Sequence, residues 1–308
     1  MSRTHAADAV APDHRGEVAS GAIPFLLGSA VLGTIGVFLV NAHADPVTAT
    51  WFRCAFGLVS LTIWVVARGQ WQYLRLSAST APGVLAAGVL IVSAWALFFY
   101  AIGRTSTGVA VVLFHVQPLW LLLLGSWWLG EAIAGRRLAS VLAAMAGLVL
   151  ATGVVEQTSM FGGSHAMPAG YWLGIAACLL GSVLTTFLTL IAKQLGRLPS
   201  GVLAWWQCAV GTVLLLFWPI QHGWPAWGSS WGWLAGLGLV HTGLAYTLIY
   251  VGTPRLSTGR IAIFQFVYPA VAIVIDRMYF GDRLSWFQLV GIVVMSVAIW
   301  YAERPVRE

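Results

Sequence analysis

The stretch from Arg104 to Glu131 reads RTSTGVAVVLFHVQPLWLLLLGSWWLGE, and it returns 151 positions later, from Arg255 to Asp282, as RLSTGRIAIFQFVYPAVAIVIDRMYFGD. The two stretches align without a gap and are identical at seven of 28 positions, which is more than unrelated apolar segments share. Both have an Arg-x-Ser-Thr-Gly start, a central proline and a Gly-acid end. The chain is therefore organised as an internal repeat.

The repeat also covers an earlier segment. WFRCAFG, from Trp51 to Gly57, is matched by WWQCAVG from Trp205 to Gly211. Two halves of similar length are thus expected on either side of a linker that is rich in glycine and contains no basic residue, at 156–168.

Composition places this chain in the membrane. It is 59% hydrophobic and only 8% charged, with a mean hydropathy of +0.84, so it cannot cover a soluble globule with polar surface. A spanning helix needs roughly 20 apolar residues. Ten such stretches are predicted, beginning near Ala22, Val47, Ala81, Thr105, Arg137, Gly170, Gly201, Trp227, Arg255 and Ser285.

The predicted fold is an all-α integral membrane protein with ten transmembrane helices. Each half has five spans, an odd number, so equivalent helices cross the bilayer in opposite directions and the two five-helix repeats are inverted. With both termini inside, twelve of the sixteen basic residues fall on the cytoplasmic side, as the positive-inside rule requires. The basic residues do not cluster with stacking aromatics, so a nucleic-acid partner is not expected.

The expected domain boundaries follow from these spans. We expect a disordered cytoplasmic N-terminus at 1–20, a first repeat at 21–155, the linker at 156–168, a second repeat at 169–302 and a cytoplasmic tail at 303–308. The partners expected are the lipid bilayer and a small-molecule substrate, and we expect a monomer.

Inverted repeats are typical of secondary transporters, because two interchangeable halves can rock about a site at the midplane. The paired prolines, Pro118 and Pro269, favour a hinge or site there, since each leaves a carbonyl four residues earlier without its helical donor. A kink that only fits the packing is the alternative for either proline alone.

Aromatic and amide side chains surround both prolines. The same offset places Tyr246 and Tyr250 at the positions of Trp95 and Phe99. A cavity walled by rings, with a few hydrogen-bonding groups, suits a flat and partly apolar solute. Each ring alone is as well explained by core or lipid contact, so the hypothesis depends on their symmetry. The predicted substrate-binding residues are Trp95, Phe99, Phe114, His115, Gln117, Tyr246, Tyr250, Gln265, Phe266 and Tyr268.

Charged and titratable residues are scarce within the spans. Arg53 is interpreted either as snorkelling to the outer interface or as forming a gate ion pair with Asp276. No acidic residue lies in the middle of a span, so only His115 and His241 are candidates for proton coupling, and a facilitator driven by the solute gradient is the simpler hypothesis. The three cysteines are isolated, so neither a metal site nor a cofactor is expected.

In these motifs the chain resembles the drug/metabolite transporter superfamily, specifically the ten-helix EamA type with two copies of the domain. Arg53, the Ser106-Thr107-Gly108 start, Pro118 and Gly130-Glu131, with their second copies, carry the resemblance. It implies that helices 1, 3, 4, 6, 8 and 9 surround the cavity and that solutes are exported across the inner membrane. The aromatic cavity is most similar to that of bacterial exporters of aromatic amino acids.

Three other functions remain to be weighed, and the first of them, a purely structural or scaffold protein, does not explain the inverted symmetry. A nucleotide-sugar or phosphate-ester carrier requires basic residues facing the cavity, and Arg53 alone supplies little. An intramembrane enzyme is disfavoured because the sequence lacks H-E-x-x-H, G-x-S-x-G and paired aspartates within spans.

Overall fold

The computed structural model describes residues 14–105, 107–154, 170–281 and 285–303. The first half of the chain forms α1 (His14–Leu32), α2 (Ile35–Ala42), α3 (Pro46–Ala67), the 3-10 helix η1 (Trp71–Leu74), α4 (Ala81–Ile102), α5 (Thr107–Phe114), α6 (Gln117–Leu129) and α7 (Gly135–Ala151). The second half forms α9 (Tyr171–Gln194), α10 (Ser200–Leu215), α11 (Phe217–His222), α12 (Ser229–Gly236), the π-helix η2 (Leu237–Leu244), α13 (Ala245–Gly252), the 3-10 helix η3 (Thr253–Arg255), α14 (Thr258–Phe264), α15 (Val267–Phe280) and α16 (Trp286–Glu303).

The helices combine into membrane spans. Within the described ranges, nine helical runs have the length and hydropathy to cross a bilayer, several of them built from two consecutive helices. The tenth predicted span corresponds to α7, which at 17 residues is slightly shorter than the others. The predicted all-α membrane fold with two repeats is confirmed.

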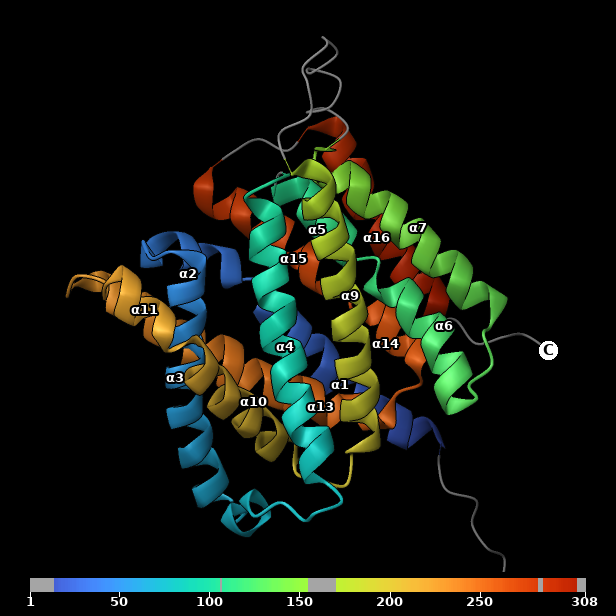
Figure 1. Cartoon of the computed structure of the whole chain (residues 1–308). Coiled ribbons are helices and arrows are strands. Elements are labelled where there is room, and N and C mark those ends of the chain that lie inside the picture. Colours follow the sequence, from blue (N-terminus) through green and yellow to red (C-terminus); the bar gives the residue numbers. More distant parts are fainter. Residues whose placement is uncertain (1–13, 106, 155–169, 282–284, 304–308) are drawn as a thin grey trace, which may run out of the picture.

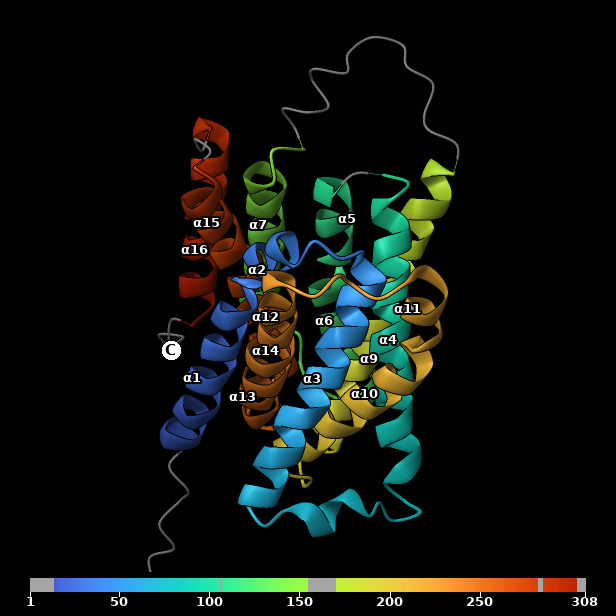
Figure 2. The ribbon, with the colours of Figure 1, turned by 90° about the vertical axis from the view of Figure 1, so that its left-hand side faces the viewer.

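The two halves run in opposite directions. We call the end of the bundle where α1 begins and α3 finishes the N-terminal side. In Figures 1 and 2, α1 leads away from this side and α9, the first helix of the second half, leads towards it. The same reversal relates α3 to α10 and α4 to α12 and α13, as expected for inverted repeats.

Packing follows this symmetry. The second span of one half packs on its counterpart, α3 on α10, and the last helices, α7 and α16, form another such pair. The pairing of α4 with α9 is repeated by α13 with α1. Each half therefore supplies equivalent walls to the space between them.

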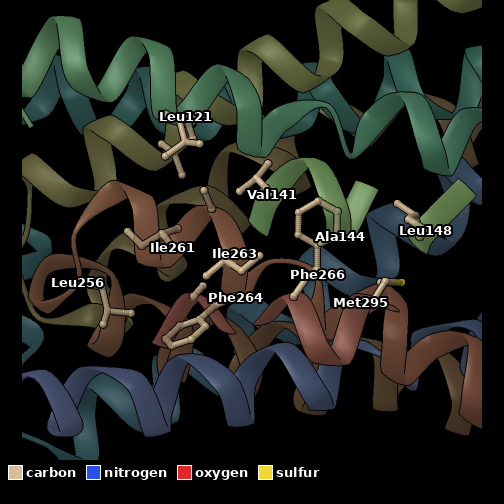
Figure 3. Close-up of a cluster of buried hydrophobic side chains, with 14 of the residues drawn as sticks. Leu121, Val141, Ala144, Leu148, Leu256, Ile261, Ile263, Phe264, Phe266 and Met295 are labelled. Atoms are coloured by element: carbon tan, nitrogen blue, oxygen red, sulfur yellow. The ribbon is translucent and has the colours of Figure 1, made fainter. Parts of the chain in front are cut away.

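Close contact between α7 and α16 depends on glycine. A Cβ on Gly147 would lie 2.8 Å from the carbonyl oxygen of Gly291, so the two backbones meet directly. The neighbouring core, shown in Figure 3, joins α6 and α7 to α14 and α16 through Leu121, Phe264 and Met295 among others.

The boundaries of the two repeats stay predictions. The first helix, α1, begins at His14, whereas the first repeat is predicted to begin at 21. Residues 1–13, the linker at 156–168 and the tail beyond 303 lie outside the described residues.

Candidate functional site

A cavity of about 270 Å³ lies between the two halves. Its walls come from the spans that the resemblance implied, namely α1 with α2, α4, α5 with α6, α9, α13 and α14 with α15, and Arg53 adds a contribution from α3. The volume is near the lower end for small-molecule pockets and suits a solute of modest size.

Nine of the ten predicted binding residues line this cavity: Trp95, Phe99, Phe114, His115, Gln117, Tyr246, Tyr250, Gln265 and Tyr268. Phe266 does not. Its ring is fully buried in the core of α6, α7, α14 and α16, and its centroid is 6.3 Å from that of His115. Phe266 is the counterpart of His115 in the repeat, but of the two only His115 lines the cavity.

Both proline spans are interrupted where they meet the cavity. The first helix of each pair ends at Phe114 and at Phe264, and the second begins at Gln117 and at Val267. The interruptions directly precede Pro118 and Pro269, which are themselves buried. The polar residues next to the breaks line the cavity, whereas the two prolines do not. Their function as hinges stays a prediction.

Arg53 lies inside the protein, about 10 Å along α3 from its first residue. Its side chain is 9% exposed, so it does not snorkel to the interface. Its Nε donates to Thr242 Oγ1 at 2.9 Å, and its guanidinium carbon lies 4.5 Å from the ring centroid of Trp95 and 5.2 Å from that of Tyr246. The side chain of Asp276 lies outside the described residues, so the gate ion pair stays a prediction.

The two candidate histidines occupy different places. His115 lines the cavity, donates from Nδ1 to the Val111 carbonyl at 2.7 Å and stacks on Tyr268. Because a carbonyl only accepts, the proton of neutral His115 sits on Nδ1 and its Nε2 is an acceptor.

His241 is fully buried and lies outside the cavity lining. Its Nε2 donates to the hydroxyl of Thr34, which itself donates to the Val31 carbonyl. His241 thus connects the π-helix η2 to the junction between α1 and α2, where the first span is broken.

The cavity is closed at the N-terminal side. Lining residues near that end, such as Phe25, Ala192, Thr253 and Ile261, are buried. Lining residues near the opposite end, among them Ile35, Leu39, Phe98 and Phe99, are partly exposed. This difference in exposure favours an opening away from the N-terminal side.

A carboxylate connects three helices at the closed side. Glu131, just after α6, accepts from Lys193 at the end of α9 and, at 2.7 and 2.8 Å, from the backbone nitrogen and hydroxyl of Thr258 at the start of α14. Burial acts to raise the pKa of Glu131, but the hydrogen bonds from Lys193 and Thr258 outweigh it and hold the pKa below its ordinary value. Its repeat counterpart, Asp282, lies outside the described residues.

Several lining residues were missed by the sequence reasoning. They lie mainly on α1, α2 and α9 and include Ser29, Leu32, Thr185, Leu188 and Thr189. The two threonines are four apart, which puts them on one face of an otherwise apolar helix. That spacing was the available signal. The apolar lining residues could not be recognised from the sequence, because helix faces that contact lipid and faces that line a cavity carry the same apolar side chains.

The family follows from comparison with known proteins. A model of the EamA-like transporter family matches residues 19–153 and 172–302, one copy in each half. The chain belongs to the EamA-like transporter family. EamA-like proteins are transporters rather than enzymes, and this one is a multi-pass membrane protein.

Relatives of this EamA-like chain are known from bacteria, archaea and plants. An uncharacterized transporter of Bacillus subtilis (strain 168), YxxF, is 27% identical over 89% of this chain and 86% of its own. An uncharacterized transporter of Archaeoglobus fulgidus is 23% identical over 92% and 96%. A chloroplastic WAT1-related protein of Arabidopsis thaliana is 26% identical over 84% and 64%.

A solved crystal structure has the same fold. It matches with a TM-score of 0.81 at 17% identity and covers 92% of this chain and 96% of the other. This likeness concerns the fold alone.

Proposed function

We propose that this EamA-like chain is a secondary transporter of the inner membrane that exports amino acids, chiefly aromatic or hydrophobic ones, and related metabolites. The observation that carries the proposal is the cavity itself. Rings from equivalent positions of two inverted repeats, Trp95 and Tyr246, line one cavity, and the exposure of its lining residues favours an opening at one side. A cavity that is closed by contacts at one side and open at the other side suits alternating access.

The lining matches such a solute. Rings present large apolar faces, and His115, Gln117 and Gln265 supply a few hydrogen-bonding groups. A nucleotide sugar would place two phosphates against a lining in which, among the described residues, Arg53 is the one charged side chain. Phosphate recognition ordinarily gathers several cations, so this alternative has little support.

Movement between a state open to one side of the membrane and a state open to the other side would use the broken spans. Pro118 and Pro269 are the proposed hinges, and Arg53 with Asp276 the proposed gate. The protein works as a monomer in this proposal, because the cavity is formed entirely between the two halves of one chain.

Counterflow of labelled L-phenylalanine in proteoliposomes tests the proposal. Wild-type protein should exchange the solute across the membrane, and Trp95→Ala or Tyr246→Ala should reduce exchange at least about tenfold, since stacking against a ring is lost. Trp127→Ala is the matched control, because Trp127 is 80% exposed on α6 and lies outside the cavity lining. Wild-type levels of exchange in both cavity variants would refute the proposed site.

A further inference from the structure

We infer that Arg53 is the anion receptor of the cavity and that the accepted solutes are those carrying a carboxylate next to an aromatic body. This inference rests on the proposed function and specifies its substrate class. It also assigns Arg53 a role in addition to the gate.

The partners of Arg53 are neutral groups. Thr242 takes one donor of the guanidinium, and the rings of Trp95 and Tyr246 lie against it. Within the described part of the chain, neither Nη group has a hydrogen-bond partner and no acidic side chain neutralises the charge. Cation–π contacts recover only a small part of the cost of taking a cation out of water. A buried charge of this kind favours an anion.

The guanidinium of Arg53 is held in place before any solute binds. Thr242 is itself fixed by its hydroxyl, which lies 3.2 Å from the Leu237 carbonyl inside the π-helix. Thr242 accepts the hydrogen bond from Nε, and the two rings hold the plane of the guanidinium. The two Nη groups are therefore left to bind a solute. That pair presents parallel donors, which match the two oxygens of a carboxylate.

The rest of the described lining carries no charge that would compete with an anion at Arg53. None of its described members is Asp, Glu or Lys, so nothing near Arg53 competes for the anion or provides a carboxylate for an isolated ammonium. The same rings that clamp Arg53 also form the wall against which an aromatic body would lie. Carboxylate and ring are therefore recognised side by side.

The gate and the receptor are compatible. A protein carboxylate such as that of Asp276 and the carboxylate of a solute would be alternative occupants of one guanidinium. Binding of the solute would then free the gate residue.

Calorimetric titration of the detergent-purified protein with two probes of equal body tests the charge preference. Hydrocinnamate carries a carboxylate and phenethylamine an ammonium on the same phenyl-ethyl frame. Wild-type protein should bind hydrocinnamate at least about tenfold more tightly than phenethylamine. Equal affinity, or preference for the amine, would overturn the inference without any variant being made.

Variants then assign the effect to Arg53. Arg53→Gln should weaken hydrocinnamate about 10- to 100-fold, as expected for loss of charge-assisted hydrogen bonds, and Arg53→Lys should lose less. Arg68→Gln is the matched control, since Arg68 also lies over a tryptophan, 4.6 Å from the Trp64 centroid, but is exposed at the end of the same helix. Thermal unfolding verifies that each variant is folded. Unchanged affinity in a folded Arg53→Gln would refute the inference.

The outcomes separate this inference from the proposed function. If L-phenylalanine is exchanged by both wild type and Arg53→Gln, transport stands and the receptor fails. If hydrocinnamate binds in an Arg53-dependent manner but no amino acid is exchanged, the receptor stands and amino-acid export fails.

Discussion

Glu131 should control whether the cavity opens at the N-terminal side. Its carboxylate, which follows α6 of the first half, joins α9 to α14, two helices of the second half that both line the cavity, through Lys193 and Thr258. If these contacts exist only while that side is closed, Glu131→Gln removes the charge at nearly constant size and shifts the equilibrium towards opening.

The magnitude follows from the three hydrogen bonds. A hydrogen bond to a charged group contributes about 1.5–3 kcal/mol and a neutral one about 0.5–1.5 kcal/mol, so each bond loses about 1 kcal/mol on neutralisation. The side chain of Glu131 is 26% exposed and that of Lys193 15%, so solvent screens part of this loss. A total of about 2–3 kcal/mol corresponds to a shift of about 30- to 150-fold in the equilibrium.

The assay is alkylation of a cysteine placed at the closed end of the cavity. Ala192→Cys, in a background lacking the three native cysteines, puts a thiol at a lining position that is 3% exposed. An impermeant reagent supplied at the N-terminal side should modify it about 30- to 150-fold faster in Glu131→Gln.

The matched control is Glu303→Gln. Glu303 forms a comparable, partly buried ion pair with Arg260, but it joins α16 to α14 within the second repeat and does not cross the cavity. Its loss should leave the alkylation rate unchanged. Equal rates in wild type and Glu131→Gln, or equal acceleration by Glu303→Gln, would refute the reasoning.

Three further predictions concern pH, coupling and packing. Because the pKa of Glu131 is lowered in the closed state, its contribution is complete above the ordinary carboxyl pKa and is lost as the pH falls through the lowered value. On acidification the alkylation rate of wild type should therefore approach that of Glu131→Gln at the same pH, a ratio that cancels the slower reaction of the thiol itself. Exchange of L-phenylalanine should carry no proton, as a pH-sensitive dye inside proteoliposomes would report, and proton flux that vanished in His115→Ala would contradict this. Gly147→Ala should destabilise the protein by about 1–3 kcal/mol in thermal unfolding, since the new methyl meets the Gly291 backbone, whereas Gly135→Ala, with open space around it, should not.

Much of the fold was predictable from the sequence because two independent features constrain it: hydropathy shows which segments must lie in the bilayer, and the repeat shows which segments must be equivalent. Hydropathy located the spans, and the odd number of spans per half required inversion. The offset also identified Trp95 and Tyr246 as equivalent, and the structure places both on one cavity. By contrast, the break between α1 and α2 at Gly33 and Thr34 was not predicted, because no proline marks it.

The candidate site was less predictable, because the repeat makes two positions equivalent in sequence while the structure gives them different surroundings. Phe99 and Tyr250 hold equivalent positions, yet Phe99 is partly exposed at the open end and Tyr250 is 8% exposed at the closed end, where its hydroxyl donates to Gln207. His115 and Phe266 differ in the same manner. A single offset cannot show which member of each pair faces the solute.

This asymmetry bears on how the transporter would move. In inverted repeats, the opposite state exchanges the environments of equivalent residues. Tyr250 should then become accessible and Phe99 buried when the N-terminal side opens, and the contacts that Glu131 makes with Thr258 should be replaced by those of Asp282 with Thr107. Glu131 and Asp282 would thus hold alternate ends of one cavity closed. Arg53, close to the rings of Trp95 and Tyr246 in the middle, would remain within reach of the solute throughout.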